Sequence, residues 1–161
     1  MLSMISLSRE FIDAIRQTHG NELKKIKLSN NGLQCIRNIE HLSPALEKLD
    51  LSCNDLSDIQ PLSLLTSLVE LDLSENRIED LSPLASLTNL RVLRLDGNRI
   101  AKCTSLEPLR NISSLRQLSL QGNGICVESS SSSGGSSDSA AAVYPFNLFQ
   151  LLPQLEVVDK W

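Results

Sequence analysis

Asparagine side chains recur at nearly even spacing along this chain of 161 residues. The steps between them are 23, 22, 22 and 25 residues, and the positions are Asn31, Asn54, Asn76, Asn98 and Asn123. An amide side chain both donates and accepts hydrogen bonds, so it can bind backbone groups that a turn leaves unpaired. We therefore expect all five to form a structural ladder of hydrogen bonds and none to bind a ligand.

The residue types used in nucleophilic and metal chemistry show no such order. The only histidines are His19 and His41, and neither aligns with a serine or cysteine nucleophile. No glycine-rich loop that could hold a phosphate precedes a predicted helix. The sequence therefore predicts a protein that is not an enzyme and that has no cofactor.

Four cysteines, Cys35, Cys53, Cys103 and Cys126, are too far apart for a Cys-x-x-Cys motif. We expect neither a metal site nor a disulfide framework. Cys103 occupies an apolar position of the repeat, which predicts a packed thiol. Cys53 is expected at the edge of a surface, where it is either an ordinary exposed thiol or a reactive one.

Each asparagine belongs to one copy of the pattern Leu-x-x-Leu-x-Leu-x-x-Asn-x-Leu. The third copy, for example, contains Leu68, Leu71, Leu73, Asn76 and Ile78. This pattern, with a period of 20–29 residues, is the signature of the leucine-rich repeat. The Leu-x-Leu pair alternates as a half-buried strand does, and the strands of successive copies should stack as a parallel sheet.

After each asparagine the apolar spacing changes from two residues to three. Residues Leu56, Ile59, Leu62 and Leu65 illustrate it, and the longest repeat has five such positions: Ile100, Cys103, Leu106, Leu109 and Ile112. A spacing of three suits 3₁₀ turns. The predicted fold class is an α/β leucine-rich repeat solenoid. It should have a curved parallel sheet on the concave side, 3₁₀ or short helical turns on the convex side, and an N-terminal capping helix.

The predicted organisation is a single domain over residues 1–161. It comprises a cap helix at 7–20, five repeats at 23–127, a serine-rich loop at 128–143 and a C-terminal cap at 144–161. Terminal repeats need such caps because they would otherwise expose apolar faces. In the cap helix, Leu7, Phe11 and Ile15, with Ile12, form an apolar stripe that packs on the first repeat or binds a partner.

The C-terminal cap has its own apolar period. Phe146, Phe149, Leu152 and Leu155 recur at three-residue steps, and residues 155–159 should form a final strand. The serine-rich loop before it cannot bury apolar surface, so it is a passive insertion or a phosphorylation target.

Composition sets the expected compartment and partner class. The formal net charge is −4, which argues against nucleic acid or an anionic membrane as the main partner. Met1 to Glu10 lacks the basic and apolar segments of a secretory signal, and there is no transmembrane run. We expect an intracellular protein of the nucleus or cytoplasm, with a cytoskeletal or ciliary location as an alternative, and a monomer when alone.

The strand residues between the leucines should point to the concave face and bind a partner. From the alignment these are Lys25, Lys27, Lys48, Asp50, Glu70, Asp72, Glu75, Val92, Arg94, Asp96 and Gln117. Asp50 and Asp72 would make a carboxylate pair, but an open surface offers no cleft in which to raise a pKa. The acidic middle is either an ordinary solvated surface or a site for a basic peptide or helix, which would relieve the repulsion between its carboxylates.

The closing segment resembles the C-terminal cap of intracellular proteins with 22-residue, phosphatase-regulator-like leucine-rich repeats. Tyr144, Phe149, the run Leu151-Leu152-Pro153-Gln154-Leu155 and Asp159 are similar to the cap of the acidic leucine-rich nuclear phosphoproteins. Leu106-Glu107-Pro108-Leu109 resembles both that family and the A-prime protein group of the U2 spliceosomal particle. The opening residues 7–12 are more similar to that second group and to ciliary and centrosomal members of the class.

These resemblances imply a non-catalytic scaffold that binds another protein on its concave face, in the manner of a nuclear regulatory phosphoprotein. The alternatives are a splicing-particle component and a ciliary, centrosomal or cytoskeletal adaptor. The long acidic tail of the nuclear phosphoproteins is not found before Trp161. We therefore expect that this chain could be the N-terminal domain of a longer protein.

Overall fold

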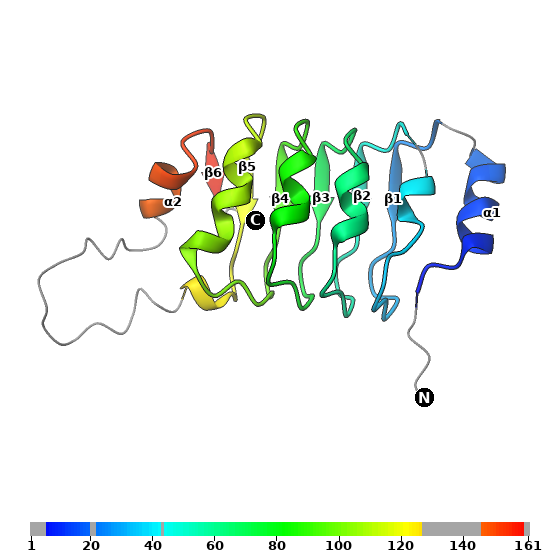
Figure 1. Cartoon of the computed structure of the whole chain (residues 1–161), viewed down its shortest axis with the longest axis horizontal. Coiled ribbons are helices and arrows are strands. Elements are labelled where there is room, and N and C mark those ends of the chain that lie inside the picture. The colour runs from blue at the N-terminus through cyan, green and yellow to red at the C-terminus, as the bar shows by residue number, and fades with distance from the viewer. Residues whose placement is uncertain (1–5, 20–21, 43, 127–145, 160–161) are drawn as a thin grey trace, which may run out of the picture.

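Six short parallel strands form one continuous sheet in the computed structural model, which describes residues 6–19, 22–42, 44–126 and 146–159. Figure 1 shows the strands side by side in chain order, with short helices along one side and a helix at each end. The strands are β1 (Lys25–Lys27), β2 (Lys48–Asp50), β3 (Glu70–Asp72), β4 (Val92–Arg94), β5 (Gln117–Ser119) and β6 (Val157–Val158).

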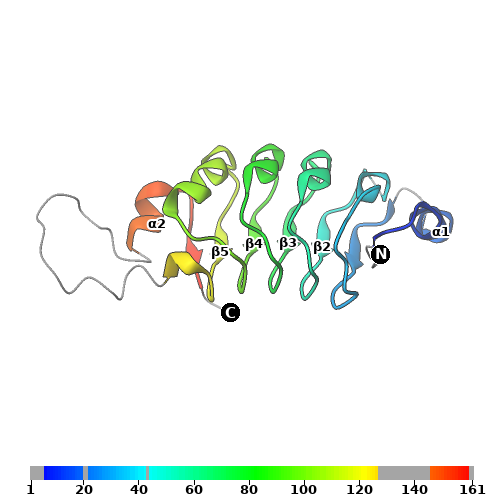
Figure 2. The same cartoon turned by 60° about the horizontal axis from the view of Figure 1, so that its bottom comes forward.

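The helices occupy the convex side and the two ends of the stack (Figures 1 and 2). They are α1 (Arg9–His19), the 3₁₀ helices η2 (Ile39–His41), η3 (Gln60–Leu64), η4 (Ser82–Ser86), η5 (Cys103–Asn111) and η6 (Gly124–Cys126), and α2 (Phe146–Leu151). The predicted fold class is confirmed. We call the surface of the sheet that faces away from η2–η5 the concave face.

Burial follows the repeated leucines. The central residue of each inner strand, such as Leu71 or Leu93, is fully buried, and so are Leu68 and Leu73 on either side of β3. A strand alternates its side chains, so the residues that flank each central leucine are left on the concave face. On the convex side, Ile78, Leu81 and Leu84 follow one another at three-residue steps and are fully buried, a spacing that suits 3₁₀ turns.

The longest repeat keeps its strand in register while its convex segment grows. Helix η5 has nine residues where η4 has five, yet Leu93 still pairs with Leu118. The predicted packing of Cys103 is wrong, because this residue is exposed. It begins the extra turn of η5, which has no counterpart in the shorter η4 on which to pack.

Two aromatic residues at the ends are not packed as their apolar spacing predicted. Phe11 is 45% exposed, whereas Ile12 is fully buried. These neighbours lie about 100° apart on an α-helix, so they cannot both face the first repeat. Phe149 is also exposed, and Leu148 is buried in its place. The buried residues here are Leu148 in α2 and Leu152 directly after it, which are four residues apart, as α-helical spacing requires.

The ends otherwise lie close to where the sequence placed them. Ser8 is positioned as the N-cap of α1, because its Oγ accepts a hydrogen bond from the Phe11 N–H at 3.2 Å. Strand β6 pairs with β5 as the final strand. The serine-rich segment 128–143 lies outside the described residues. No helix in the described ranges combines the length and apolar character needed to cross a membrane.

Candidate functional site: the concave face

Strand register arranges the concave side chains in two rows that cross the sheet. The first row is Lys25, Lys48, Glu70, Val92, Gln117 and Val157, and the second begins Lys27, Asp50, Asp72, Arg94 and Ser119. Neighbouring strands are about 4.8 Å apart, so adjacent members of a row can touch. A small hollow of about 100 Å³ lies over β1–β4 between the two rows.

Ion pairs within the chain neutralise the acidic middle of this face. Lys48 Nζ lies 2.8 Å from Glu70 Oε2, and Arg94 Nη1 lies 3.0 Å from Glu70 Oε1. Lys27 Nζ lies 3.5 Å from Asp50 Oδ2. Arg94 also reaches Asp72, at 4.0 Å. The expected repulsion between the carboxylates is therefore relieved without a partner, which removes our first reason for a basic ligand.

The same contacts lower the pKa of two carboxyl groups, those of Glu70 and Asp50. The Lys48 ammonium, which donates to Glu70, lowers the pKa of this carboxyl most. Burial opposes that effect, and the Arg94 guanidinium then adds to it, so the pKa of Glu70 lies below its ordinary value. For Asp50, burial would raise the pKa, but hydrogen bonds from Ser52 and the charge of Lys27 together lower it. Both shifts favour the ionised form, in which these carboxylates pair with the cations of the neighbouring strands.

The other charged residues predicted on the concave face differ in whether they already have a partner within the chain. Lys25 is exposed and makes no ion pair within the described residues, and Glu75 is likewise exposed and without an ion pair there. Asp96 is occupied inside the fold, because it accepts hydrogen bonds from the Ser119 hydroxyl and from the Gln121 N–H, the latter at 2.8 Å. Sequence reasoning missed this link, since it joins positions 23 and 25 residues apart that no motif relates.

Half-buried apolar and neutral side chains complete the C-terminal part of the first row. Val92, Gln117 and Val157 lie in consecutive register on β4, β5 and β6. Asp159 then ends the sheet, where its Oδ1 accepts a hydrogen bond from the Leu120 N–H at 2.8 Å. The concave face thus changes from charged over β1–β4 to largely uncharged over β5–β6.

Four of the five ladder asparagines join their own repeat to the preceding one. Asn98 is representative: its Oδ1 accepts from the Ile78 N–H at 3.0 Å, and its Nδ2 donates to the carbonyls of Leu73 at 2.9 Å and Leu95 at 3.0 Å. Asn54, Asn76 and Asn123 are buried with the same pattern of contacts.

Asn31 does not fit the predicted ladder. It is exposed, and its Nδ2 donates to the Ser29 carbonyl in its own turn. In the described residues helix α1, and not another repeat, precedes it, so the Asn31 amide has no carbonyl of a preceding repeat to bind. The backbone N–H of Asn31 instead donates to Asn54 at 3.1 Å, so this residue receives support from the ladder without providing any.

The residue before each asparagine has a positive φ, which tightens the turn. Glycine occupies this position twice, as Gly97 and Gly122, whereas Asn30, Cys53 and Glu75 adopt it with a side chain. This conformation is unfavourable for residues with a Cβ. It places Glu75 and Cys53 in the exposed turns along one rim of the concave face.

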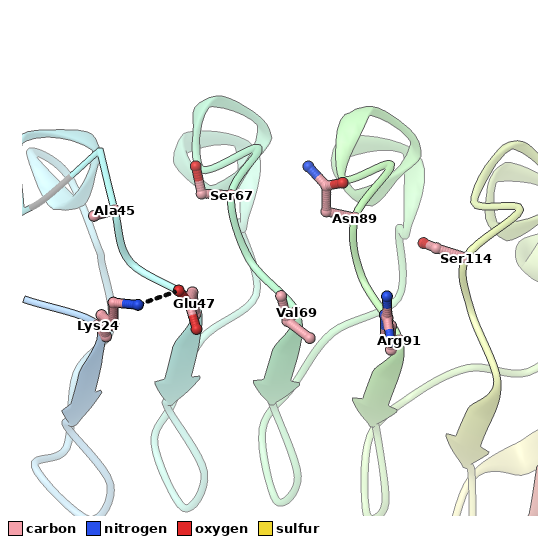
Figure 3. A pocket seen from close by; sticks show the side chains of 8 residues that line it. All are labelled: Lys24, Ala45, Glu47, Ser67, Val69, Asn89, Arg91 and Ser114. Carbon is pink, nitrogen blue, oxygen red and sulfur yellow. Dashed lines mark ion pairs between the residues drawn. The ribbon is translucent and has the colours of Figure 1, made fainter.

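A second hollow, of about 460 Å³, lies beside the strands at the edge where they begin (Figure 3). Figure 3 shows the Lys24–Glu47 ion pair, whose atoms are 3.0 Å apart, at one end of this hollow and Arg91 further along. The polar side chains along its wall, such as Ser67 and Asn89, donate to carbonyls of the preceding repeat. These groups hold repeats together.

No cluster of histidine, cysteine or acidic side chains suited to a metal ion is found in the described part of the chain. Asp50 and Asp72 are register neighbours, as the sequence suggested. However, Asp50 accepts hydrogen bonds from Ser52, and Asp72 accepts one from Ser74. The two carboxylates therefore bind the backbone that follows β2 and β3.

Comparison with known families and proteins agrees with this architecture. A model for two copies of the leucine-rich repeat matches residues 66–111, and a single-repeat model matches residues 43–59. Curated proteins give no match.

Solved structures of similar fold come from several organisms. Internalin C2 of Listeria monocytogenes is 27% identical over 84% of this chain, with a TM-score of 0.62, and this chain spans 50% of the internalin. A chain of the Drosophila melanogaster SNF/U2A' complex is 24% identical, with a TM-score of 0.68. That alignment covers 97% of this chain and 84% of the other. This protein is therefore built of leucine-rich repeats and has the solenoid fold of proteins made from them.

Proposed function

We propose that this chain is a non-catalytic scaffold whose concave face binds a segment of another protein. The observation that carries the proposal is the pair of in-register rows, which display charged side chains over β1–β4 and half-buried apolar ones over β4–β6. Solenoids use such extended concave surfaces for binding. The structure from Drosophila is that of a complex, which supports protein binding by this fold.

The free charges define what the partner presents. Because Asp50 and Glu70 are already paired, the groups left for a partner are Lys25 on β1 and Glu75 in the turn after β3. Two strand spacings, about 10 Å across the sheet, separate their repeats. A helix or extended segment with a basic residue near Glu75 and an acidic residue near Lys25 would satisfy both. We therefore expect the basic residue of the partner only at the end of its segment that lies near Glu75.

An apolar side chain of the same segment should contact Val92 and Val157. Both are half-buried, and they lie on either side of Gln117 in the first row. Buried apolar contacts at the centre of an interface provide most of its affinity, whereas exposed charges set orientation and association rate. We therefore assign the affinity to the valines and the selectivity to Lys25 and Glu75.

The test is capture of partners from the native cell, followed by affinity measurement with the captured protein and purified variants of this chain. Lys25→Glu and Glu75→Lys should each weaken binding about tenfold, since each removes an attraction and adds a repulsion. Glu107→Lys is the matched control, because Glu107 is an exposed glutamate on convex η5. Equal affinity for all three variants and the wild type would refute concave binding.

The cellular setting is a separate part of the proposal. We place the scaffold first in the nucleus, as a regulator that resembles the acidic nuclear phosphoproteins. A splicing-particle component and a ciliary, centrosomal or cytoskeletal adaptor are the alternatives. The identity of the captured partner separates them: a nuclear regulatory protein supports the first, an RNA-recognition protein the second, and a ciliary or cytoskeletal protein the third.

A further inference from the structure

The residues that directly precede the strands form a column along the edge where the strands begin. The backbone N–H of each one donates to the carbonyl of the member before it, as Arg91 does to Val69 at 2.8 Å and Arg116 does to Arg91 at 2.9 Å. The members of this edge column are Lys24, Glu47, Val69, Arg91, Arg116 and Glu156. The first four line the hollow of about 460 Å³ in Figure 3, which we call the edge hollow.

Arg91 is the one charged member of the edge column that makes no ion pair within the described residues. Lys24 pairs with Glu47 at 3.0 Å, and Arg116 pairs with Glu156 at 3.3 Å. Between these two pairs, Arg91 has the uncharged Val69 as one neighbour and the like-charged Arg116 as the other. Arg91 is also exposed, so a group that enters the edge hollow can reach it. The hollow therefore contains one positive charge that no described carboxylate contacts.

The uncharged polar side chains of the edge hollow already bind the backbone. Ser67, Asn89 and Ser114 each donate to a carbonyl of the preceding repeat, at 2.7, 2.9 and 2.7 Å. The Arg91 side chain makes no hydrogen bond within the described residues. Half-buried Val69 provides apolar surface beside it. A guanidinium next to a small apolar surface suits a carboxylate on a short aliphatic stem, as in aspartate or glutamate.

The edge hollow adjoins the concave face at Val92. This valine follows Arg91 in the chain and is the first residue of β4. The proposed function assigns the apolar contact of the partner to Val92 and Val157. Successive residues of an extended chain are about 3.3 Å apart, so a partner residue on Val92 has close neighbours within reach of Arg91. One bound segment can therefore contact both.

A single carboxylate matches this position better than a nucleic acid does. Nucleic acid binding draws most of its affinity from several phosphate contacts with uncommitted cations. The cations nearest in the sheet, Lys48 and Arg94, are already paired with Glu70. The formal net charge of −4 also repels a polyanion. One uncommitted guanidinium beside an apolar side chain is complementary to one acidic residue of a protein.

We propose that the segment bound on the concave face carries an aspartate or glutamate that enters the edge hollow and accepts hydrogen bonds from the Arg91 guanidinium. The stem of this acidic residue packs on Val69. The inference rests on the proposed function, and it adds a charged contact to those of Lys25 and Glu75. Arg91 is thereby a specificity residue, because it selects partners with an acidic residue close to the apolar one that contacts Val92.

Random dodecapeptides displayed on phage and selected on the full chain provide the probes. Enriched peptides are synthesised, and their affinities are measured by fluorescence anisotropy. Peptides that Lys25→Glu or Glu75→Lys weakens at least about fivefold are assigned to the concave face. We expect these peptides to share an aspartate or glutamate within two positions of an apolar residue. Arg91→Gln should weaken their binding about tenfold, the usual effect of removing a charge-assisted hydrogen bond.

A charge exchange separates direct contact from a structural role of Arg91. Replacing the acidic residue of the peptide by lysine should weaken binding to the wild type and strengthen binding to Arg91→Glu, which a structural role would not produce. Arg110→Gln is the matched control, because Arg110 is another exposed arginine without an ion pair in the described residues and lies on convex η5. It should leave the affinity unchanged. Thermal melting checks that all the variants fold.

The outcomes separate this inference from the proposed function. If the concave variants weaken the peptides but Arg91→Gln changes the affinity by less than about twofold, the edge contact is wrong and concave binding stands. Failure of the charge exchange also overturns the edge contact. A fluorescein-labelled random RNA whose affinity Arg91→Gln weakens, in place of the peptides, would assign the hollow to phosphate. If no enriched peptide responds to Lys25→Glu or Glu75→Lys, concave binding and this inference are both refuted.

Discussion

Asn31 and Asn98 hold the same position in two copies of one repeat, but they do different things. Asn98 is buried, and its amide joins its own repeat to the preceding one, whereas the side chain of Asn31 is exposed and donates within its own turn. The difference lies in what comes before each of them. A repeat precedes Asn98, and helix α1 precedes the repeat of Asn31.

The leucine positions show the same contrast between the first repeat and the middle of the stack. Leu93, at the centre of β4, is fully buried between two neighbouring strands, while Ile26, at the centre of β1, is only partly buried. In a solenoid, each repeat gains stability from its neighbours. The role of a residue therefore depends on its repeat number as much as on its place in the repeat.

The largest effect that distinguishes the two regions should come from the strand centres. Leu93→Ala should lower the free energy of unfolding by about 3 kcal/mol, because it removes fully buried methyl groups and leaves a cavity between rigid neighbours. Ile26→Ala should cost clearly less, since its site is partly open to water. Urea denaturation followed by circular dichroism measures both, and equal losses would mean that the first repeat is as well supported as the middle.

The asparagines should differ by a slightly smaller amount. Asn98→Ala leaves the buried Ile78 N–H without its acceptor and removes one of the two amide donors to the Leu73 carbonyl, so we expect a loss of about 2 kcal/mol. Asn31→Ala should cost less than about 0.5 kcal/mol. The same denaturation experiment applies. A loss at Asn31 as large as that at Asn98 would contradict the dependence on a preceding repeat.

These contrasts explain which parts of the structure could be predicted from sequence. The positions of Leu68, Leu71 and Leu73 follow from one repeated pattern, and each copy confirms the others. Asn31 and Cys103 match their repeat positions equally well, yet the structure places both at the surface. Asn31 lacks a preceding repeat to bind, and Cys103 lacks a matching turn in η4 on which to pack. The pattern within a single repeat contains no information about such neighbours.

The candidate site was predicted in position but not in its electrostatics. The alignment placed Lys48, Glu70 and Arg94 on the concave face, where they are found. It did not pair them, because ion pairs depend on side-chain reach across strands.

Glycine turns give a third, smaller contrast. Gly122→Ala should destabilise by about 1 kcal/mol, because φ is +71° and the new Cβ would lie 3.3 Å from the Gly97 nitrogen. Asn30→Ala, at the equivalent turn of the first repeat, replaces one side chain by another at positive φ and should change stability by less than half of that. Thermal unfolding of the two variants makes the comparison, and a larger loss at Asn30 would contradict it.

The smallest expected effect concerns pH and the paired carboxylates. Glu70, in the middle of the sheet, has its pKa lowered below the ordinary value of 4.5, so the folded state holds its ionised form more strongly than the unfolded state does. Its contribution to stability is complete above that ordinary value and is lost as the pH falls through the lower pKa of the folded state. With half-exposed partners we expect only about 0.5 kcal/mol.

Glu70→Gln should therefore reduce the loss of stability on acidification below the ordinary pKa of a glutamate, as measured by urea denaturation at a series of pH values. Lys25→Gln is the matched control at the end of the same row, because Lys25 makes no ion pair in the described residues and its removal should leave the pH profile unchanged. The middle of the row has cations on both neighbouring strands, and the end does not. If the pH dependence of stability changed in Lys25→Gln but not in Glu70→Gln, the charge that affects stability would lie at the end of the sheet, and the role given to Glu70 would be wrong.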